Sequence, residues 1–120
     1  MDPPEQEPTV GTADRISAEI ASIHYQSYGQ PVESIQTHIL DDVVVCVLDV
    51  ALLPHERTLL EHDRGIESIR EVRKQFQQAI GATFAASVEH MTGRRVVAFL
   101  SETHIEPSFS VEFFRLAPSS

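Results

Sequence analysis

The sequence predicts an α+β domain of the order α-ββ-α-α-ββ, in which an antiparallel sheet of about four strands packs against one long amphipathic helix. Two observations favour this class: a helical periodicity runs through residues 66–92, and pairs of strand-like segments precede and follow it. With 120 residues, the chain is long enough for one domain and too short for two. We expect that domain at 13–117, between a tail at 1–12 and a short end at 118–120.

The first helix is expected over residues 13–28. Isoleucines recur there with helical spacing, and Gly29 followed by Pro31 ends the helix. The preceding twelve residues hold three prolines, three carboxylates and almost nothing to bury. We therefore expect this acidic stretch to be a mobile tail.

A β-hairpin and a short helix are predicted next. Apolar and polar side chains alternate along the first strand of the hairpin, and Asp41 with Asp42 supplies the turn. The β-branched run 43–48 returns as a strand that we expect to be buried on both sides or nearly so. A short helix should begin at Pro54, because proline is well tolerated at the first helical position, and end near His62.

The long helix has the clearest periodic pattern. At about 100° per residue, the apolar side chains of 66–92 fall within an arc of roughly 160°, which is typical of an amphipathic helix on a core. Gly81 should allow another backbone to approach closely, and Gly93 should end the helix. Two further strands are expected over 95–101 and 109–116.

The charge balance excludes two classes of partner. Eighteen acidic against nine basic residues give a formal net charge of −9, whereas nucleic acid and anionic lipid reward clustered Lys and Arg. The longest apolar run is far shorter than the ~20 residues of a membrane span, and the acidic start does not resemble a signal peptide. A single thiol, Cys46, fits a reducing compartment. We expect a cytoplasmic protein that binds no nucleic acid and does not insert into membranes directly.

Arg73 is the most informative polar residue. It projects into the middle of the apolar arc of the long helix, and a guanidinium that cannot lose its charge must find an anion there or reach an edge. Glu56 is the best candidate partner and Asp49 the second. The sequence therefore predicts either a structural ion pair between Arg73 and Glu56 or a small-anion site that contains Arg73.

Further cations lie near the start of the same helix. Arg64, Arg70 and Lys74 form a modest basic cluster, in which Glu67 and Glu71 supply pairing partners at helical spacing. The alternative to such pairing is a docking surface for an acidic partner or a small anion. An anion sensor would use Arg73 with Arg70 or Arg94.

No pattern identifies a catalytic centre, a metal site or a cofactor. His55-Glu56 lacks the second histidine that a zinc-protease helix needs, because position 59 is Leu. Cys46 lies in an apolar strand, where burial keeps a thiol protonated. The chain contains no nucleophile elbow and no glycine-rich phosphate loop. We therefore expect no catalytic residue, no metal ligand and no cofactor.

Several segments resemble the MpsC-like domain family, over about residues 14–117. The resemblance depends on order and spacing, and its clearest pieces are Tyr28-Gly29-Gln30-Pro31, Ile39 to Leu48, Leu52-x-x-x-Glu56-Arg57-x-Leu59, Glu71-x-Arg73, Thr92-Gly93-Arg94-x-Val96 and Glu112-Phe113-Phe114-x-Leu116. It implies a small accessory of a Na+-translocating, membrane-potential-generating system, associated with membrane ion or bicarbonate uptake. It implies no established catalytic residue.

The expected function is therefore that of a noncatalytic accessory or regulatory domain, and the alternative is the small-anion sensor. An integral membrane transport protein is the partner that the resemblance implies. A homodimer is expected on mechanical grounds, because one long and one short helix leave part of a four-stranded sheet uncovered. Phe109, Val111 and Phe113 are candidates for the apolar positions that a second copy would cover.

Overall fold

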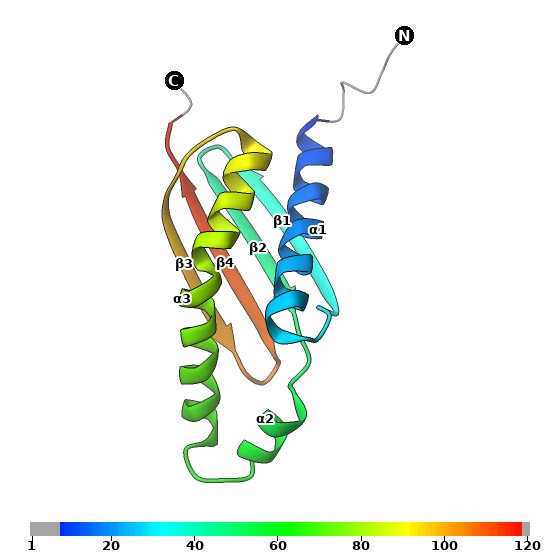
Figure 1. The fold of residues 1–120 in the computed structure, drawn as a ribbon, viewed down its shortest axis with the longest axis vertical. Helices are drawn as coiled ribbons and strands as arrows, with labels where there is room; N and C mark the ends of the chain where they lie inside the picture. The colour runs from blue at the N-terminus through cyan, green and yellow to red at the C-terminus, as the bar shows by residue number, and fades with distance from the viewer. Residues whose placement is uncertain (1–7, 119–120) are drawn as a thin grey trace.

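The computed structural model describes residues 8–118 of the chain (Figure 1). Its elements follow the predicted order: α1 (Pro8–Tyr28), β1 (Ser34–Leu40), β2 (Val43–Asp49), α2 (Pro54–Leu59), α3 (Gly65–Thr92), β3 (Val96–His104) and β4 (Phe109–Leu116). The strands form one sheet of order β1-β2-β4-β3, and all neighbours are antiparallel. The predicted α+β class and four-stranded sheet are confirmed.

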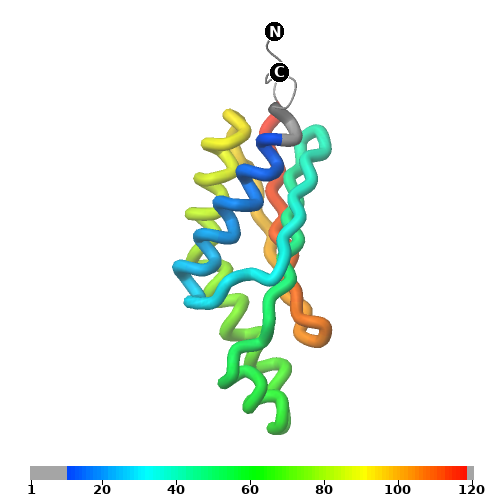
Figure 2. The backbone as a smooth tube through the Cα atoms, turned by 90° about the vertical axis from the view of Figure 1, so that its right-hand side faces the viewer, coloured from blue at the N-terminus to red at the C-terminus, as the bar shows by residue number. Residues whose placement is uncertain are grey.

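The molecule has two layers. Helices α1 and α3 lie side by side on one face of the sheet, α1 against β1 and α3 against β3 (Figures 1 and 2). Among residues 8–118, Figure 2 shows no helix on the opposite face, which we call the outer face. The short helix α2 lies beside the N-terminal half of α3, beyond the end of the sheet (Figure 1). The predicted packing of a long helix on the sheet is confirmed for α3.

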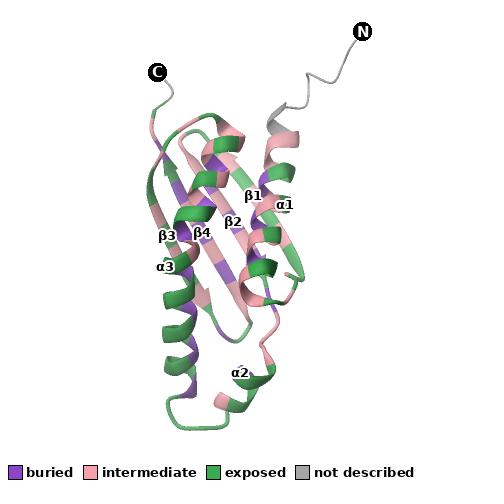
Figure 3. Ribbon diagram, in the orientation of Figure 1, coloured by how far each residue is buried: buried purple, intermediate pink, exposed green. Residues whose placement is uncertain are grey.

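The core fills the space between the helices and the inner face of the sheet. Its fully buried apolar side chains come from both helices and from the two central strands; among them are Ile16, Ile20, Val44, Leu48, Phe84, Val88, Phe114 and Leu116. Along β2 and β4, buried residues alternate with half-buried ones (Figure 3). The expectation that 43–48 is buried on both sides is therefore wrong. Val43, Val45 and Val47 face the outer side, which no helix covers.

Two helix boundaries differ from the predictions. Helix α1 begins at Pro8 and not at 13, so the part of the predicted tail at 8–12 is helical, while 1–7 lie outside the described residues. A proline fits this first position because its missing N–H would be unpaired there. Helix α2 ends at Leu59, short of His62, because the chain turns back there to reach α3.

Two glycines fix where α3 lies and where it ends. A Cβ on Gly81 would come within 2.8 Å of the ring of Phe99 on β3. The close approach predicted at Gly81 is thus made by an aromatic side chain and not by a backbone, because Phe99 points from the sheet at the helix. Gly93 adopts a φ of 71° and donates its N–H to the Glu89 carbonyl, as predicted for the residue that ends the helix.

Candidate functional site

Arg73 and Glu56 form a buried ion pair between α3 and α2. Nε of Arg73 donates to Oε2 of Glu56 at 2.9 Å, and Nη2 donates to Oε1 at 2.8 Å. The exposed fraction is 4% for Arg73 and 3% for Glu56. This two-bond geometry matches a planar guanidinium to a planar carboxylate. The predicted partner is correct, whereas Asp49 instead accepts a bond from Ser34 at the sheet edge.

The short helix places Glu56 where Arg73 can reach it. Pro54 starts α2, and two residues later Glu56 turns back to accept the Leu53 N–H at 2.8 Å through Oε1. Burial alone would raise the pKa of Glu56, but the bonds from Arg73 and Leu53 outweigh it and hold that pKa below its usual value. Nη1 of Arg73 also lies 3.4 Å from the Ser108 hydroxyl. The pair therefore joins α2, α3 and the β3–β4 loop.

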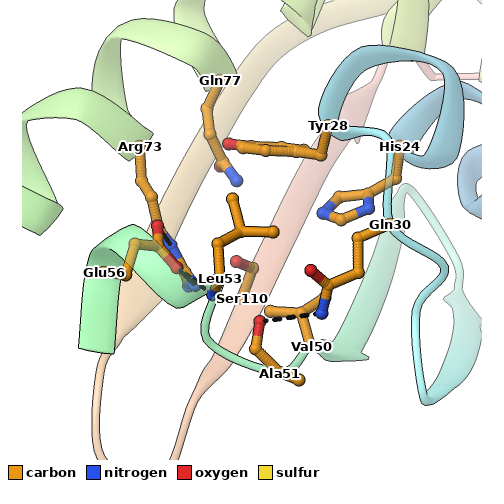
Figure 4. A pocket seen from close by; sticks show the side chains of 10 residues that line it. All are labelled: His24, Tyr28, Gln30, Val50, Ala51, Leu53, Glu56, Arg73, Gln77 and Ser110. Atoms are coloured by element: carbon orange, nitrogen blue, oxygen red, sulfur yellow. Dashed lines mark hydrogen bonds and ion pairs between the residues drawn. The ribbon is translucent and has the colours of Figure 1, made fainter. Parts of the chain in front are cut away.

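A small cavity lies next to this ion pair (Figure 4). Figure 4 shows Arg73 and Glu56 at one end, His24 at the other, and Tyr28 and Gln77 along one side. Three polar atoms of this lining are buried without a hydrogen-bond partner: His24 Nδ1, the Tyr28 hydroxyl and Gln77 Oε1. The cavity measures about 10 Å³, which is room for one water-sized group. It is too small for bicarbonate or phosphate unless its walls move.

The aromatic residues of the cavity come from the C-terminal end of α1. The rings of His24 and Tyr28 lie 4.4 Å apart, and burial lowers the pKa of His24. Burial also raises the pKa of Tyr28 to about 12, so both side chains are neutral near pH 7. The wall opposite Arg73 is therefore uncharged.

A polar row crosses the inner face of the sheet beyond this cavity. It consists of Thr37, Cys46, Glu112 and Ser101, which are directly paired across β1, β2, β4 and β3. The Thr37 hydroxyl donates to Cys46 Sγ at 3.4 Å, and the Ser17 and Thr37 hydroxyls lie 2.6 Å apart. Burial raises the pKa of Cys46 to about 11, as expected for a core thiol. Glu112, in the middle of the row, is fully buried.

The other basic residues predicted for an anion site do not join Arg73. Arg70 is exposed on α3, in a surface groove with Glu67 and Lys74. Arg94 lies at the opposite end of α3 from α2, where its guanidinium binds the Asp42 carboxylate and two backbone carbonyls. The expected grouping of Arg73 with Arg70 or Arg94 is not formed, because Arg70 lies on the exposed side of α3 and Arg94 follows the far end of that helix.

Sequence reasoning missed four polar residues that the fold brings to this region: His24, Tyr28, Gln77 and Glu112. For two of them, the spacing along the sequence could have predicted an inward-facing side chain. Gln77 lies one helical turn after Arg73, and Glu112 alternates with Phe114 and Leu116 on the inward side of β4. Over the described range, no group of three or more His, Cys, Asp or Glu side chains lies close enough to hold a metal ion.

The fold and the site define a small α+β domain with two helices on one sheet face and a buried ion pair at one end. The chain matches, over residues 11–118, the family described as the Na+-translocating membrane potential-generating system (MpsC). It therefore belongs to the MpsC family, as the sequence resemblance indicated. No curated protein and no solved structure matches the chain. Within residues 8–118, no helix is long and apolar enough to cross a membrane.

Proposed function

We propose that this chain is a noncatalytic, cytoplasmic accessory or regulatory domain of a membrane-potential-generating system for ion or bicarbonate uptake. In this proposal it forms a homodimer and binds an integral membrane transport protein of that system. The family match over residues 11–118 carries the proposal, because the family is described by a Na+-translocating, potential-generating system. The geometry of Arg73 supports a noncatalytic role, since its guanidinium is already engaged by Glu56.

The outer face of the sheet supports the homodimer. Its centre is apolar and half-buried, and consists of Val43, Val45, Val47, Val111 and Phe113. Two exposed leucines border it, Leu40 at 61% and Leu100 at 64% exposure. Phe109, the third predicted position, lies on the same face against the ring of His104. The largest apolar patch on a protein surface is often a functional one, and polar residues around it are typical of a protein–protein interaction site.

The size and charge of the outer face fit a second copy. Four strands spaced about 4.8 Å apart and roughly 25 Å long give about 480 Å². Two copies packed face to face would bury about 1,000 Å² in total, which is the lower limit for a specific interface. Phe113 and Leu100 belong to one row of residues paired across the strands of the outer face. Arg115 lies in the next outer-face row on one side of it, and Glu102 lies in the next outer-face row on the other side. A twofold rotation about that row brings Arg115 over the row that contains Glu102 of the second copy.

Light scattering coupled to size-exclusion chromatography tests the dimer. We expect a dimer at tens of micromolar for the unmodified chain and a folded monomer for Val45→Lys, which places a charge at the centre of the outer face. Ala18→Lys adds the same charge to the exposed side of α1 and should leave the dimer intact. A strict monomer of the unmodified chain at tens of micromolar would contradict the dimer.

Two measurements separate the accessory role from the anion sensor. Affinity purification from membranes of the source cell should recover one specific integral transport protein, identified by mass spectrometry. Calorimetric titration with bicarbonate, phosphate and nucleotides should give no saturable heat, because the cavity beside Arg73 holds one water-sized group. Saturable heat that Arg73→Ala abolishes would favour the sensor, and the absence of any recovered membrane protein would remove the support for the accessory role.

A further inference from the structure

Glu112 is an unusual residue for the middle of a protein core. Its exposed fraction is 0%, and it projects from the central strand β4 into the layer between sheet and helices. Among residues 8–118, both carboxylate oxygens lack a hydrogen-bond partner of ordinary geometry, and neither observed ion pair involves Glu112. A buried carboxylate in this position is strongly destabilising unless something neutralises it.

The groups around Glu112 supply no positive charge. Cys46 on β2 and Ser101 on β3 flank Glu112 on the two strands that neighbour β4. Thr37 on β1 ends the same row. From the helices, Gln77 on α3 and Tyr28 on α1 face this region. Two cations of α3 lie near Gln77: Glu56 from α2 already occupies the guanidinium of Arg73, and Lys74 is exposed in the groove that Gln77 and Ser101 also line. Neither forms an ion pair with Glu112 within residues 8–118.

The unsatisfied atoms indicate what is missing. Both oxygens of Glu112 and Oε1 of Gln77 are acceptors that form no hydrogen bond of ordinary geometry within residues 8–118, although the Ser101 hydroxyl and the Gln77 amide lie near Glu112. One proton on the Glu112 carboxyl removes the buried charge and at the same time creates an O–H donor next to acceptor atoms on Gln77 and Ser101. A single bound proton thus neutralises the buried charge and supplies a hydrogen-bond donor.

We propose that Glu112, with Gln77 and Ser101, is a proton-binding site that makes the packing of α3 on the sheet depend on pH. With the proton bound, the core beneath α3 is uncharged and fully packed. When the proton leaves, a carboxylate is left under Gln77, and α3 loosens from the sheet. This site is distinct from the Arg73–Glu56 pair, and it does not depend on the proposed accessory function.

The direction of the pKa shift agrees with this geometry. Burial raises the pKa of Glu112 to about 7, although Ser101 and Gln77 partly oppose the rise. In the unfolded chain a glutamate titrates near pH ~4.3. Between these two values the folded state binds more protons than the unfolded state, so stability is highest at low pH in this window and falls as pH rises through about 7.

Urea unfolding across pH, with Glu112→Gln as the matched variant, tests the proposal. Glutamine keeps the shape and stays neutral. Relative to this variant, the unfolding constant of the unmodified chain should rise about tenfold per pH unit from about pH 5 to about pH 7, then level off. His24, whose pKa burial lowers, contributes a slope of opposite sign, but it is present in both proteins and cancels. Glu61→Gln, in the exposed turn between α2 and α3, should keep the slope of the unmodified chain.

A direct titration keeps the proposal testable even if Glu112→Gln does not fold. Carboxyl carbon NMR of the unmodified chain should show one buried glutamate that titrates near neutrality and disappears in any folded Glu112 variant. Parallel unfolding profiles, or a Glu112 carboxyl that titrates in the ordinary range of glutamate, would overturn the proposal. So would a Glu112-dependent stabilisation by NaCl over KCl at equal ionic strength and alkaline pH, because it would identify a bound metal cation in place of the proton.

Discussion

Arg73→Ala should be among the most damaging single substitutions in this chain. It removes both bonds to Glu56, at 2.8 and 2.9 Å, and the longer contact with Ser108. Glu56, which is 3% exposed in the intact chain, would keep the Leu53 N–H as its remaining hydrogen-bond donor. Breaking a buried ion pair from one side costs about 3–5 kcal/mol, a large share of the ~5–15 kcal/mol by which domains are stable. At about 4 °C per kcal/mol, the melting temperature should fall by roughly 12–20 °C.

The assay is thermal and urea unfolding of a set of related variants. Glu56→Gln removes the other charge and should also destabilise the domain, because it leaves Arg73 buried without a counter-charge. The double variant Arg73→Met with Glu56→Leu removes both charges at similar volume, and should recover stability to within about 1 kcal/mol of the unmodified chain. A loss below about 1 kcal/mol for Arg73→Ala would refute the reasoning, because the pair would then behave as an exposed one.

The pH dependence of this pair has the opposite sign to that of Glu112. The pKa of Glu56 is held below its usual value, so the folded state binds fewer protons than the unfolded state in the acidic range. The contribution of the pair is therefore fully present above the ordinary glutamate pKa, and is lost as pH falls through the lowered value. Arg73→Ala should accordingly flatten the acid side of the stability profile.

Two further predictions concern packing. Gly65→Ala should cost about 1–3 kcal/mol in urea unfolding, because the added Cβ would overlap the backbone carbonyl of Leu59; Gly11→Ala, which meets nothing within 4 Å, should not destabilise the domain and so serves as its control. Cys46 should resist alkylation at pH 8 in the folded chain and react rapidly in denaturant, since burial raises its pKa to about 11; equal rates in both states would contradict a buried thiol.

The Arg73–Glu56 pair was predictable because its signals are local. The helical projection alone places Arg73 among apolar side chains, and Pro54 alone fixes the short helix on which Glu56 occupies the first turn. Because a buried guanidinium needs an anion, Glu56 can then be predicted as the partner of Arg73. By contrast, Arg70 lies one turn before Arg73 but on the exposed side of the helix. Arg94 could be assigned to the same site only from its distance across the fold, which spacing along the chain does not give.

Glu112 shows where sequence reasoning ends. Alternation along β4 places its side chain on the inward side with Phe114 and Leu116, so its burial could have been predicted. Its lack of a partner could not, because its neighbours come from β2, β3 and α3 and depend on strand register and on the position of α3 over the sheet. That position is set by Gly81 against Phe99, a contact between residues 18 positions apart.

The wrong prediction for β2 carries information about assembly. A continuous run of β-branched residues is typical of a strand covered on both sides, and 43–48 has that composition. The helices of this chain cover one side, so Val43, Val45 and Val47 keep an apolar composition on a face that borders water in the monomer. Solvent-facing strand positions in a lone domain usually alternate to polar residues instead. Val45 pairs across the sheet with Phe113, and Val47 with Val111, so the apolar character spans two strands. The composition of β2 is thus the one expected if a second layer covers the outer face, which is the arrangement that the proposed homodimer supplies.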